Sequence, residues 1–374
     1  MSVGIITSAA TINLEMSAEF GPLPPAFLPV GGTRLFKYQT ALLRKLVDRI
    51  VLTLPESFVP SVYDDDLLAA LGIDIVHIPD GLPLAESIML AVIQSIQGNE
   101  PLVVLHGDTL FCGLEEFPGD AISVHHRDHP YPWAIVAGRE PLVVTHVGNS
   151  RQAEPAIVSG LFSFSQGMVF LKCLARARKD FLAALNDYAK QQPAFATAED
   201  RGEWLDLGHL NTYYDSRRML TTQRRFNSLV IGRDTVRKSS TQYDKMEAEA
   251  SWFEALPASL GFAVPAYLGR AEASSSGAGY CLAYEHLCSL SDLYVFGMLP
   301  AKVWRRVLMS CAAVLAKFRA VKPAAVDAGW YNQLYTGKTT ERFARFARAN
   351  DDVLFVVNHP FQIANRHTKQ VPDF

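Results

Sequence analysis

Two aspartates far apart in the chain each stand at the end of an apolar run. Asp108 follows the run PLVVL (101–105) within the segment LHGDT (105–109), and Asp206 lies in EWLDLG (203–208). In α/β sheets, ligands bind beyond the carboxyl ends of the strands. Mg²⁺ prefers oxygen ligands and usually takes one or two carboxylates together with substrate phosphates. The two aspartates therefore predict a magnesium site for phosphoryl or nucleotidyl transfer.

The elements that must position these aspartates alternate between strands and helices over roughly the first 200 residues. Short apolar runs predict strands at 3–9, 49–54, 73–78, 102–105, 134–137, 142–147 and 157–164. Amphipathic stretches predict helices at 35–47, 67–71, 85–97 and 168–190, the last beginning near Ser165. This alternation indicates an α/β fold with a doubly wound sheet.

Composition limits the classes of function. The chain has 374 residues, 49% of them hydrophobic and 20% charged, which predicts a folded protein of two domains. Its net charge of −3 gives no general attraction for nucleic acid or for an anionic membrane. No apolar run is long enough to predict membrane insertion, and the start lacks the basic region of a signal peptide. The five scattered cysteines favour reduced thiols in the cytoplasm.

Five segments carry a family resemblance. In chain order they are GPLPPAFLPVGGTRL (21–35), PDGLPLAES (79–87), HGD (106–108), SGLFSF (159–164) and EWLDLG (203–208). Together they resemble the sugar-phosphate nucleotidyltransferases, over about residues 1–215. The resemblance implies a Rossmann-like nucleotidyltransferase sheet with helices on both faces. It also implies Mg²⁺-dependent transfer from a nucleoside triphosphate to a sugar 1-phosphate or similar alcohol phosphate, as in surface polysaccharide synthesis.

The resemblance also implies roles for individual residues. Asp108 and Asp206 would be the catalytic residues and would hold the Mg²⁺. The residues implied to bind substrate or nucleotide are Gly81, Glu154, Gly160 and Arg34. Four of these residues have a plainer alternative: either aspartate could cap the turn or helix that follows, Gly81 could belong to an ordinary turn, and Glu154 could be a surface carboxylate.

The first loop departs from the family pattern. Where a glycine-rich G-x-G-x-R phosphate loop is expected, the chain has SAATINLEM (8–16), and Pro25 replaces the lysine of the signature. Both changes remove positive charge or N–H donors from the place where a triphosphate should bind. Arg34 or Lys37 could supply the missing positive charge. Two interpretations stay open: a divergent enzyme with a rebuilt loop, or a binding or scaffold protein that keeps the fold.

A second resemblance begins after an arginine-rich stretch that predicts a boundary between domains at 1–215 and 226–374. The segments FNSLVI (226–231), VRKS (236–239), KMEAEASW (245–252) and YCLAYEHL (280–287) resemble the small lobe of the aminoglycoside-phosphotransferase and choline-kinase group. The resemblance implies that Lys238 contacts nucleotide phosphates and that Glu249 pairs with it. A surface salt bridge explains the two residues equally well.

The kinase-like region lacks its catalytic loop. The segment HPFQIAN (359–365) has Phe361 where an H-x-D-x-x-x-x-N loop would have aspartate. We therefore expect no kinase activity and interpret the region as an incomplete α+β kinase-like domain from a truncated or frameshifted frame, or as a fragment of a bifunctional protein. The histidines at 125, 126 and 129 are expected in a polar loop and not as metal ligands.

Overall fold

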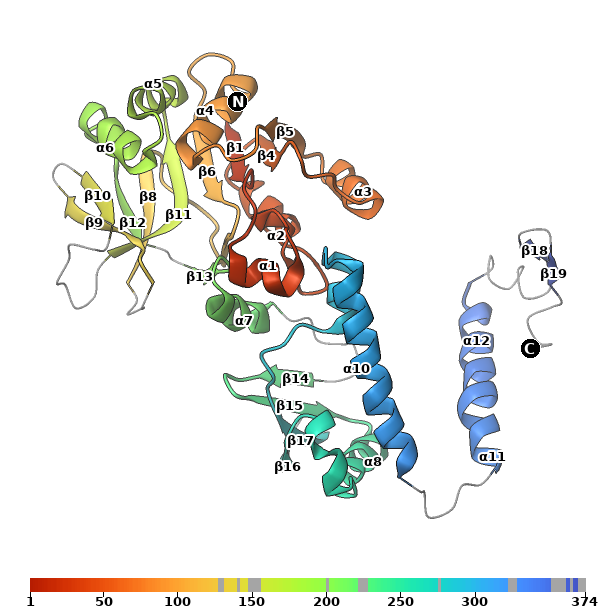
Figure 1. The fold of residues 1–374 in the computed structure, drawn as a ribbon. Helices are drawn as coiled ribbons and strands as arrows, with labels where there is room; N and C mark the ends of the chain where they lie inside the picture. The colour runs from red at the N-terminus through yellow and green to blue at the C-terminus, as the bar shows by residue number, and fades with distance from the viewer. Residues whose placement is uncertain are drawn as a thin grey trace. The chain divides into compact units, whose positions relative to one another are not determined.

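The structure is a computed structural model that describes residues 1–126, 131–139, 142–146, 156–199, 202–220, 228–274, 277–321, 328–350, 361–363 and 366–368. The chain divides into two compact units, Met1–Leu308 and Met309–Phe374, and the boundary falls within the long helix α10 (Ala301–Ala320) drawn in Figure 1.

A nine-stranded sheet forms the centre of the first unit. Its main path runs β10-β9-β11-β6-β1-β4-β5, and β8 adds to β11 and β12 to β8. The strands are β1 (Val3–Thr7), β4 (Arg49–Pro55), β5 (Asp74–Ile78), β6 (Leu102–His106), β8 (Ala121–His126), β9 (Ala134–Arg139), β10 (Leu142–His146), β11 (Ala156–Phe164) and β12 (Ala196–Glu199). The strands β6, β1, β4 and β5 are parallel, whereas β11 runs antiparallel to β6. The predicted α/β class is confirmed.

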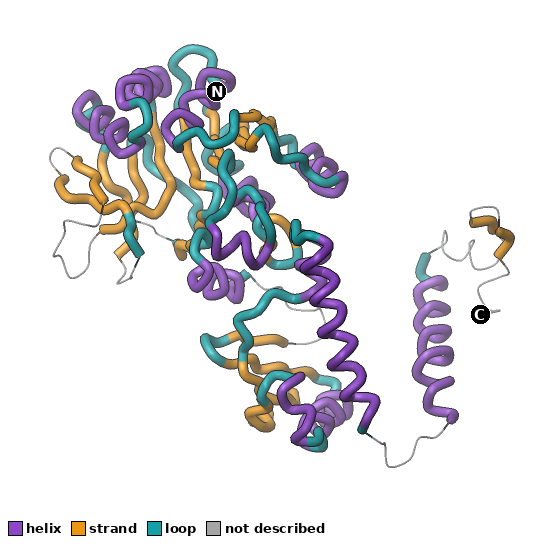
Figure 2. Tube along the Cα trace, viewed as in Figure 1, coloured by secondary structure: helices purple, strands orange, loops and turns teal. Residues whose placement is uncertain are grey.

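Helices cover both faces of this sheet (Figure 2). They are α1 (Leu14–Phe20), α2 (Leu35–Leu43), α3 (Val62–Ala70), α4 (Leu84–Ser95), α5 (Gly167–Ala177), α6 (Phe181–Gln191) and α7 (Leu210–Met219). Successive strand residues point to opposite faces. Thus Ile5 belongs to the core under α4, α5 and α6, whereas its neighbour Ile6 belongs to the core under α1 and α2. The sheet is therefore buried on both sides, as a parallel sheet requires.

Two short ribbons lie beside the central sheet. One pairs β2 (Pro29–Val30) with β3 (Thr33–Arg34), close after the short helix η1 (Pro25–Phe27). The other pairs β7 (Thr109–Cys112) with β13 (Glu203–Asp206) in antiparallel register. The second ribbon brings together the two segments that the sequence singles out for their aspartates.

Two local predictions were wrong, and one helix was missed. The stretch at 168–190 is two helices, because the chain turns at Arg178 with φ 58° and Asp180 then caps α6. The loop expected around the histidines begins later, since His125 and His126 end β8, while the histidine at 129 lies outside the described residues. Helix α1 was not predicted at all, although Asn13 caps it.

A second, smaller sheet follows in the same unit. Its order is β14-β15-β17-β16, with helix α8 (Tyr243–Glu254) packed against it. The strands are β14 (Ser228–Ile231), β15 (Thr235–Ser240), β16 (Tyr267–Ser274) and β17 (Gly277–Ala283). β14 and β15 pair in antiparallel register as a hairpin. The short helices η3 (Ala258–Ala263) and α9 (Leu290–Phe296) complete the region.

The remaining elements are mostly helical. They are α10 (Ala301–Ala320), α11 (Ala328–Tyr331), η4 (Asn332–Gly337), α12 (Lys338–Arg348), β18 (Phe361–Ile363) and β19 (Arg366–Thr368). Among the helices that the structure describes, none combines the length and the apolar character that crossing a bilayer requires. The domain division at 215 and 226 stays a prediction.

Candidate active site

The two aspartates meet where the β7–β13 ribbon leaves the end of β6. Asp108 precedes β7, and Asp206 is the last residue of β13, opposite Thr109 in the ribbon. The ladder continues one step further, because the Leu207 N–H donates to the Asp108 carbonyl oxygen at 2.8 Å. Backbone pairing therefore fixes the spacing between the two acidic residues.

Gly208 lies between the two carboxyl groups. Its N–H donates to Asp206 Oδ1 at 3.1 Å. On its other side, a Cβ atom built at this position would lie 2.5 Å from Asp108 Oδ2. Such an approach is too close for any side chain, so the Asp108 carboxylate occupies the space that the glycine leaves. Both carboxyl groups thus contact the same residue.

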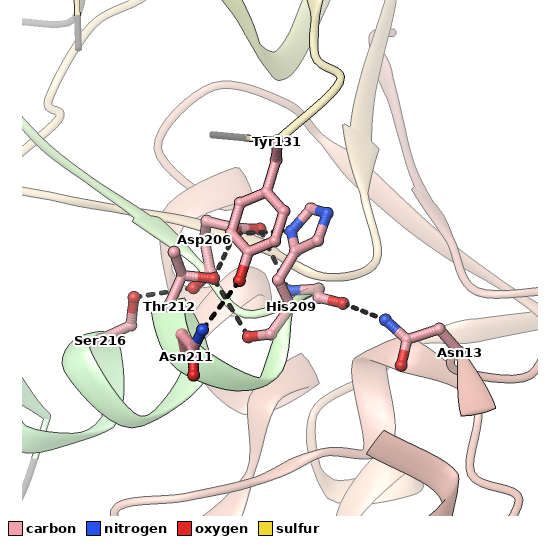
Figure 3. A network of polar contacts seen from close by, with 8 residues as sticks. Asn13, Tyr131, Asp206, His209, Asn211, Thr212 and Ser216 are labelled. Atoms are coloured by element: carbon pink, nitrogen blue, oxygen red, sulfur yellow. Dashed lines mark hydrogen bonds and ion pairs between the residues drawn. The ribbon is translucent and has the colours of Figure 1, made fainter. Parts of the chain in front are cut away.

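Helix α7 holds the Asp206 carboxylate from below (Figure 3). The hydroxyl of Thr212 donates to Oδ2, and His209 Nδ1 lies 2.9 Å from the same oxygen. The hydroxyl of Ser216 donates to the Asp206 carbonyl at 2.8 Å. The Tyr131 ring stacks on the His209 imidazole, with 4.0 Å between centroids. Asp206 is 3% exposed, and these bonds fix its orientation.

The pair carries like charges in a partly buried place. Burial, and then the negative charge of Asp206, raise the pKa of Asp108 to about 6. The hydrogen bond to Asp206, opposed by burial and reinforced by the charges of both aspartates, raises the pKa of His209.

A divalent cation would relieve the repulsion between the carboxylates. In the described part of the chain, no group of three or more acidic, histidine or cysteine side chains is arranged to hold a metal ion, and Mg²⁺ commonly completes its shell with water and phosphate. The donor set fits that ion.

The loop after β1 reaches the same site without glycine. Asn13 caps α1 by accepting from the Met16 N–H at 2.9 Å, and its Nδ2 donates to the Gly208 carbonyl at 2.8 Å (Figure 3). The Ser8 hydroxyl accepts from the Ala26 N–H at 3.0 Å, so the start of the loop is tied to the signature segment. Where the family pattern has a phosphate cradle, this chain has a short capped helix that supports the carboxylate loop.

A cavity of about 90 Å³ opens on the other side of this loop. Its lining is uncharged and comes from the end of β1, from β4 and from the start of α4: Thr7, Ala9, Ala10, Thr53, Leu82, Leu84, Ser87 and Ile88. Gly81, with φ 79°, turns the chain into this lining just before Leu82. A Cβ built at Gly107 would lie 2.3 Å from the Thr7 carbonyl oxygen, which places the cavity beside the segment that carries Asp108.

Gly160 lies at the same end of the sheet. It has φ 94°, in the stretch of β11 where the pairing with β8 shifts register. A Cβ there would come within 3.0 Å of Thr109 Oγ1 and 3.2 Å of His106 Nδ1. Burial lowers the pKa of His106 to about 4, which keeps the ring neutral. Gly160 therefore lets β11 approach the strand end that positions Asp108.

Arg34 is held inside the fold. It is 4% exposed and forms a two-pronged ion pair with Asp64, at 2.7 and 2.8 Å. Its Nη1 donates to the carbonyl oxygens of Phe27 and Phe296. The guanidinium group therefore makes its hydrogen bonds inside the fold. These contacts give no support to the prediction that Arg34 replaces the missing phosphate contacts. Glu154 lies outside the described residues.

Lys238 and Glu249 are paired in the second sheet. Lys238 Nζ, on β15, lies 2.5 Å from Glu249 Oε2, on α8, and the Tyr280 hydroxyl donates to the same oxygen at 2.8 Å. Both charged side chains are partly exposed. The predicted pairing is present, while a nucleotide contact by Lys238 stays a prediction.

Sequence reasoning did not identify the residues that support Asp206. The supporting residues follow Asp206 at offsets of 3, 6 and 10: His209, Thr212 and Ser216. These offsets match a turn followed by a helix that places one face against Asp206. That spacing was a usable signal. Asn13 gave no comparable signal, because its contact with Gly208 joins segments far apart in the chain.

A scan against protein-family models and a search of curated proteins each find no match. Among solved structures, the chain is similar to a Bacillus anthracis protein described as a glucose-1-phosphate thymidylyltransferase, with 15% identity over 60% of this chain and 97% of that chain (TM-score 0.48). It is similar to a UDP-glucose pyrophosphorylase complexed with UDP-glucose, with 13% identity over 59% and 98% of the two chains (TM-score 0.46). A third is CTP:phosphocholine cytidylyltransferase from Streptococcus pneumoniae, with 16% identity over 59% and 99% (TM-score 0.44).

Proposed function

We propose that this chain is a Mg²⁺-dependent nucleotidyltransferase that joins a nucleoside triphosphate to a sugar 1-phosphate or a similar alcohol phosphate. The observation that carries the proposal is the convergence of Asp108 and Asp206 on Gly208 at the end of β6. A buried pair of like charges raises the free energy of the fold unless a cation or a proton offsets it. Activated sugars of this kind are precursors for surface polysaccharides.

In the reaction, an oxygen of the acceptor phosphate attacks the α-phosphorus of the triphosphate. The new oxygen–phosphorus bond replaces the bond to the β-phosphate oxygen, and pyrophosphate leaves. Both reactants are anions, so positioning and charge neutralisation supply most of the catalysis. Asp108 and Asp206 would hold Mg²⁺, which when bound neutralises phosphate charge.

The other residues have supporting roles in the proposal. Thr212 and His209 orient the Asp206 carboxylate through their contacts with Oδ2. The uncharged cavity next to Gly81 receives part of the nucleobase, and Gly160 lets β11 pack against the strand end that positions Asp108. Glu154 is proposed to bind acceptor hydroxyls. Arg34 has no part in it, because its guanidinium group is already used.

Pyrophosphate release tests the proposal directly. The protein is incubated with Mg²⁺, each nucleoside triphosphate and a panel of sugar 1-phosphates and alcohol phosphates. We expect release with one pair, and none from D108N. A folded wild-type protein that releases no pyrophosphate with any pair would contradict the proposal.

A second candidate is a non-catalytic binding or scaffold protein. The observation that favours it is the loop after β1, whose Asn13 is committed to Gly208 and to capping α1. Among the described residues, the carboxylate pair makes an ion-pair contact with His209 Nδ1 and with no lysine or arginine. Calorimetry with triphosphate and Mg²⁺ separates the candidates: micromolar binding supports the enzyme, and no heat at millimolar ligand supports the scaffold.

A further inference from the structure

Helix α7 joins the site to a segment far along the chain. Its residues Thr212 and Ser216 hold Asp206, and the next residue, Arg217, reaches in another direction. Arg217 Nη2 lies 2.5 Å from Asp292 Oδ2, and Nη1 donates to the Leu287 carbonyl at 3.0 Å. The two charged side chains are only 15% and 19% exposed, so solvent screens this pair less than a surface pair.

Helix α1 is fastened to the same segment. At its beginning, Asn13 donates to the Gly208 carbonyl. At its end, the Met298 N–H donates to the Phe20 carbonyl at 2.7 Å. Gly21 approaches Met298 so closely that a Cβ would lie 2.5 Å from its carbonyl carbon. The two helices also touch, because the Tyr214 hydroxyl donates to Glu19 at 2.8 Å.

The segment 287–298, here called the clasp, is itself packed into the first core. Its helix α9 is capped by Ser289, and Leu293 packs against the core cluster that contains Phe20 and Tyr213. Phe296 is buried, with the Arg34 guanidinium 5.1 Å from its ring centre. The clasp follows β17 of the second sheet, so the chain links that sheet to both helices behind the carboxylates.

We propose that the clasp is a positioning element for the Asp108–Asp206 pair and that Arg217 is the positioning residue that connects them. The inference rests on the proposed function. One helix holds the Asp206 side chain and the other holds the Gly208 carbonyl, and each is anchored to the clasp. Releasing the clasp removes an anchor from both supports at once. The cavity beside Gly81 is lined by residues on or next to β1, β4 and α4, and none of its lining residues belongs to the clasp.

The test compares two matched variants of the full chain. R217M removes the bonds to Asp292 and to the Leu287 carbonyl. R218M makes the same chemical change one residue later on α7. Among the described residues, Arg218 donates to the Asp215 carbonyl and pairs with the Asp215 carboxylate, both within its own helix. Hydrogen exchange of the Gly208 and Tyr213 amides and the kinetics of pyrophosphate release are measured for each. If R217M does not fold, D292N removes the same ion pair from the α9 side.

We expect R217M to speed exchange at Gly208 and Tyr213 and to lower kcat about tenfold, while KM for the triphosphate changes less than about twofold. R218M should behave as wild type, and R217K should recover part of kcat.

Unchanged exchange in R217M and D292N would overturn the inference. So would faster exchange with unchanged kcat, or an equal rise throughout the central sheet. A wild-type protein without turnover, whose R217M variant still exchanges faster at these amides, would refute the proposed function and leave the coupling standing.

Discussion

Gly208 and Asp108 are in contact: a Cβ atom at residue 208 would lie 2.5 Å from Asp108 Oδ2 and 3.0 Å from its Cγ. The same glycine donates its N–H to Asp206 Oδ1. One backbone position therefore touches both carboxyl groups and sets how closely they approach. The requirement for glycine here comes from space and not from backbone conformation.

Replacing Gly208 with alanine should remove activity without unfolding the protein. The added methyl group forces the Asp108 carboxylate out of its place, and a displacement of about 1 Å at a reacting centre can cost about 10²-fold in rate. Pyrophosphate release measures the loss, and a thermal melt checks the fold. The matched control is G119A, because a Cβ at Gly119 meets nothing within 4 Å. Equal activity of G208A and G119A would mean that the Asp108 position is unimportant for turnover.

Asp108 should make the protein less stable as the pH rises. Its pKa in the fold, about 6, lies above the ordinary value of 3.8, so the folded state holds the proton more tightly than the unfolded chain does. The free energy of unfolding therefore falls between pH 4 and 6, and the whole cost is present above the folded pKa. D108N should remove this cost, which the rise of the pKa from 3.8 to about 6 puts at about 3 kcal/mol at pH 7.5. Denaturant unfolding in EDTA at pH 4.5 and 7.5 measures both effects; a D108N protein that is less stable at pH 7.5 would contradict the argument.

The sequence predicted the central sheet well, because buried parallel strands leave a strong apolar signal. The runs that became β1, β4, β5 and β6 were placed to within a few residues. The sequence also predicted that Asp108 and Asp206 converge, although they meet through the separate β7–β13 ribbon and not along a shared edge of the central sheet. Hydrophobic pattern and motif order carried that information.

The remaining details depend on contacts that local sequence does not encode. The break at Arg178 requires a positive φ at a non-glycine residue, which no propensity predicts. Arg34 bonds to Asp64 and to the Phe296 carbonyl, both distant in the sequence. A side chain that local sequence leaves available for phosphate therefore makes its hydrogen bonds within the fold. Helix α1 has only seven residues and depends on its cap and its core contacts.

Replacing Gly160 with alanine should destabilise the fold. Its φ of 94° is unfavourable for an L residue, and the added Cβ would crowd both Thr109 Oγ1 and the His106 ring. We expect a loss of about 1 to 3 kcal/mol in the free energy of unfolding. G261A is the control, because Gly261 has neither a positive φ nor a neighbour within 4 Å. A G160A protein with wild-type stability and reduced substrate affinity would instead favour direct contact between Gly160 and substrate.

Arg34 should matter for stability and not for nucleotide affinity. R34M leaves the Asp64 carboxylate buried without its partner, and breaking a buried ion pair from one side costs about 3 to 5 kcal/mol. The comparison is R176M, which breaks the exposed pair with Asp187 and should cost less than about 1 kcal/mol. Chemical denaturation measures both losses. In the folded fraction of R34M, KM for the triphosphate should stay within about twofold of wild type, because the guanidinium group already has four partners inside the fold. A tenfold rise in KM with intact folding would restore Arg34 to the nucleotide site.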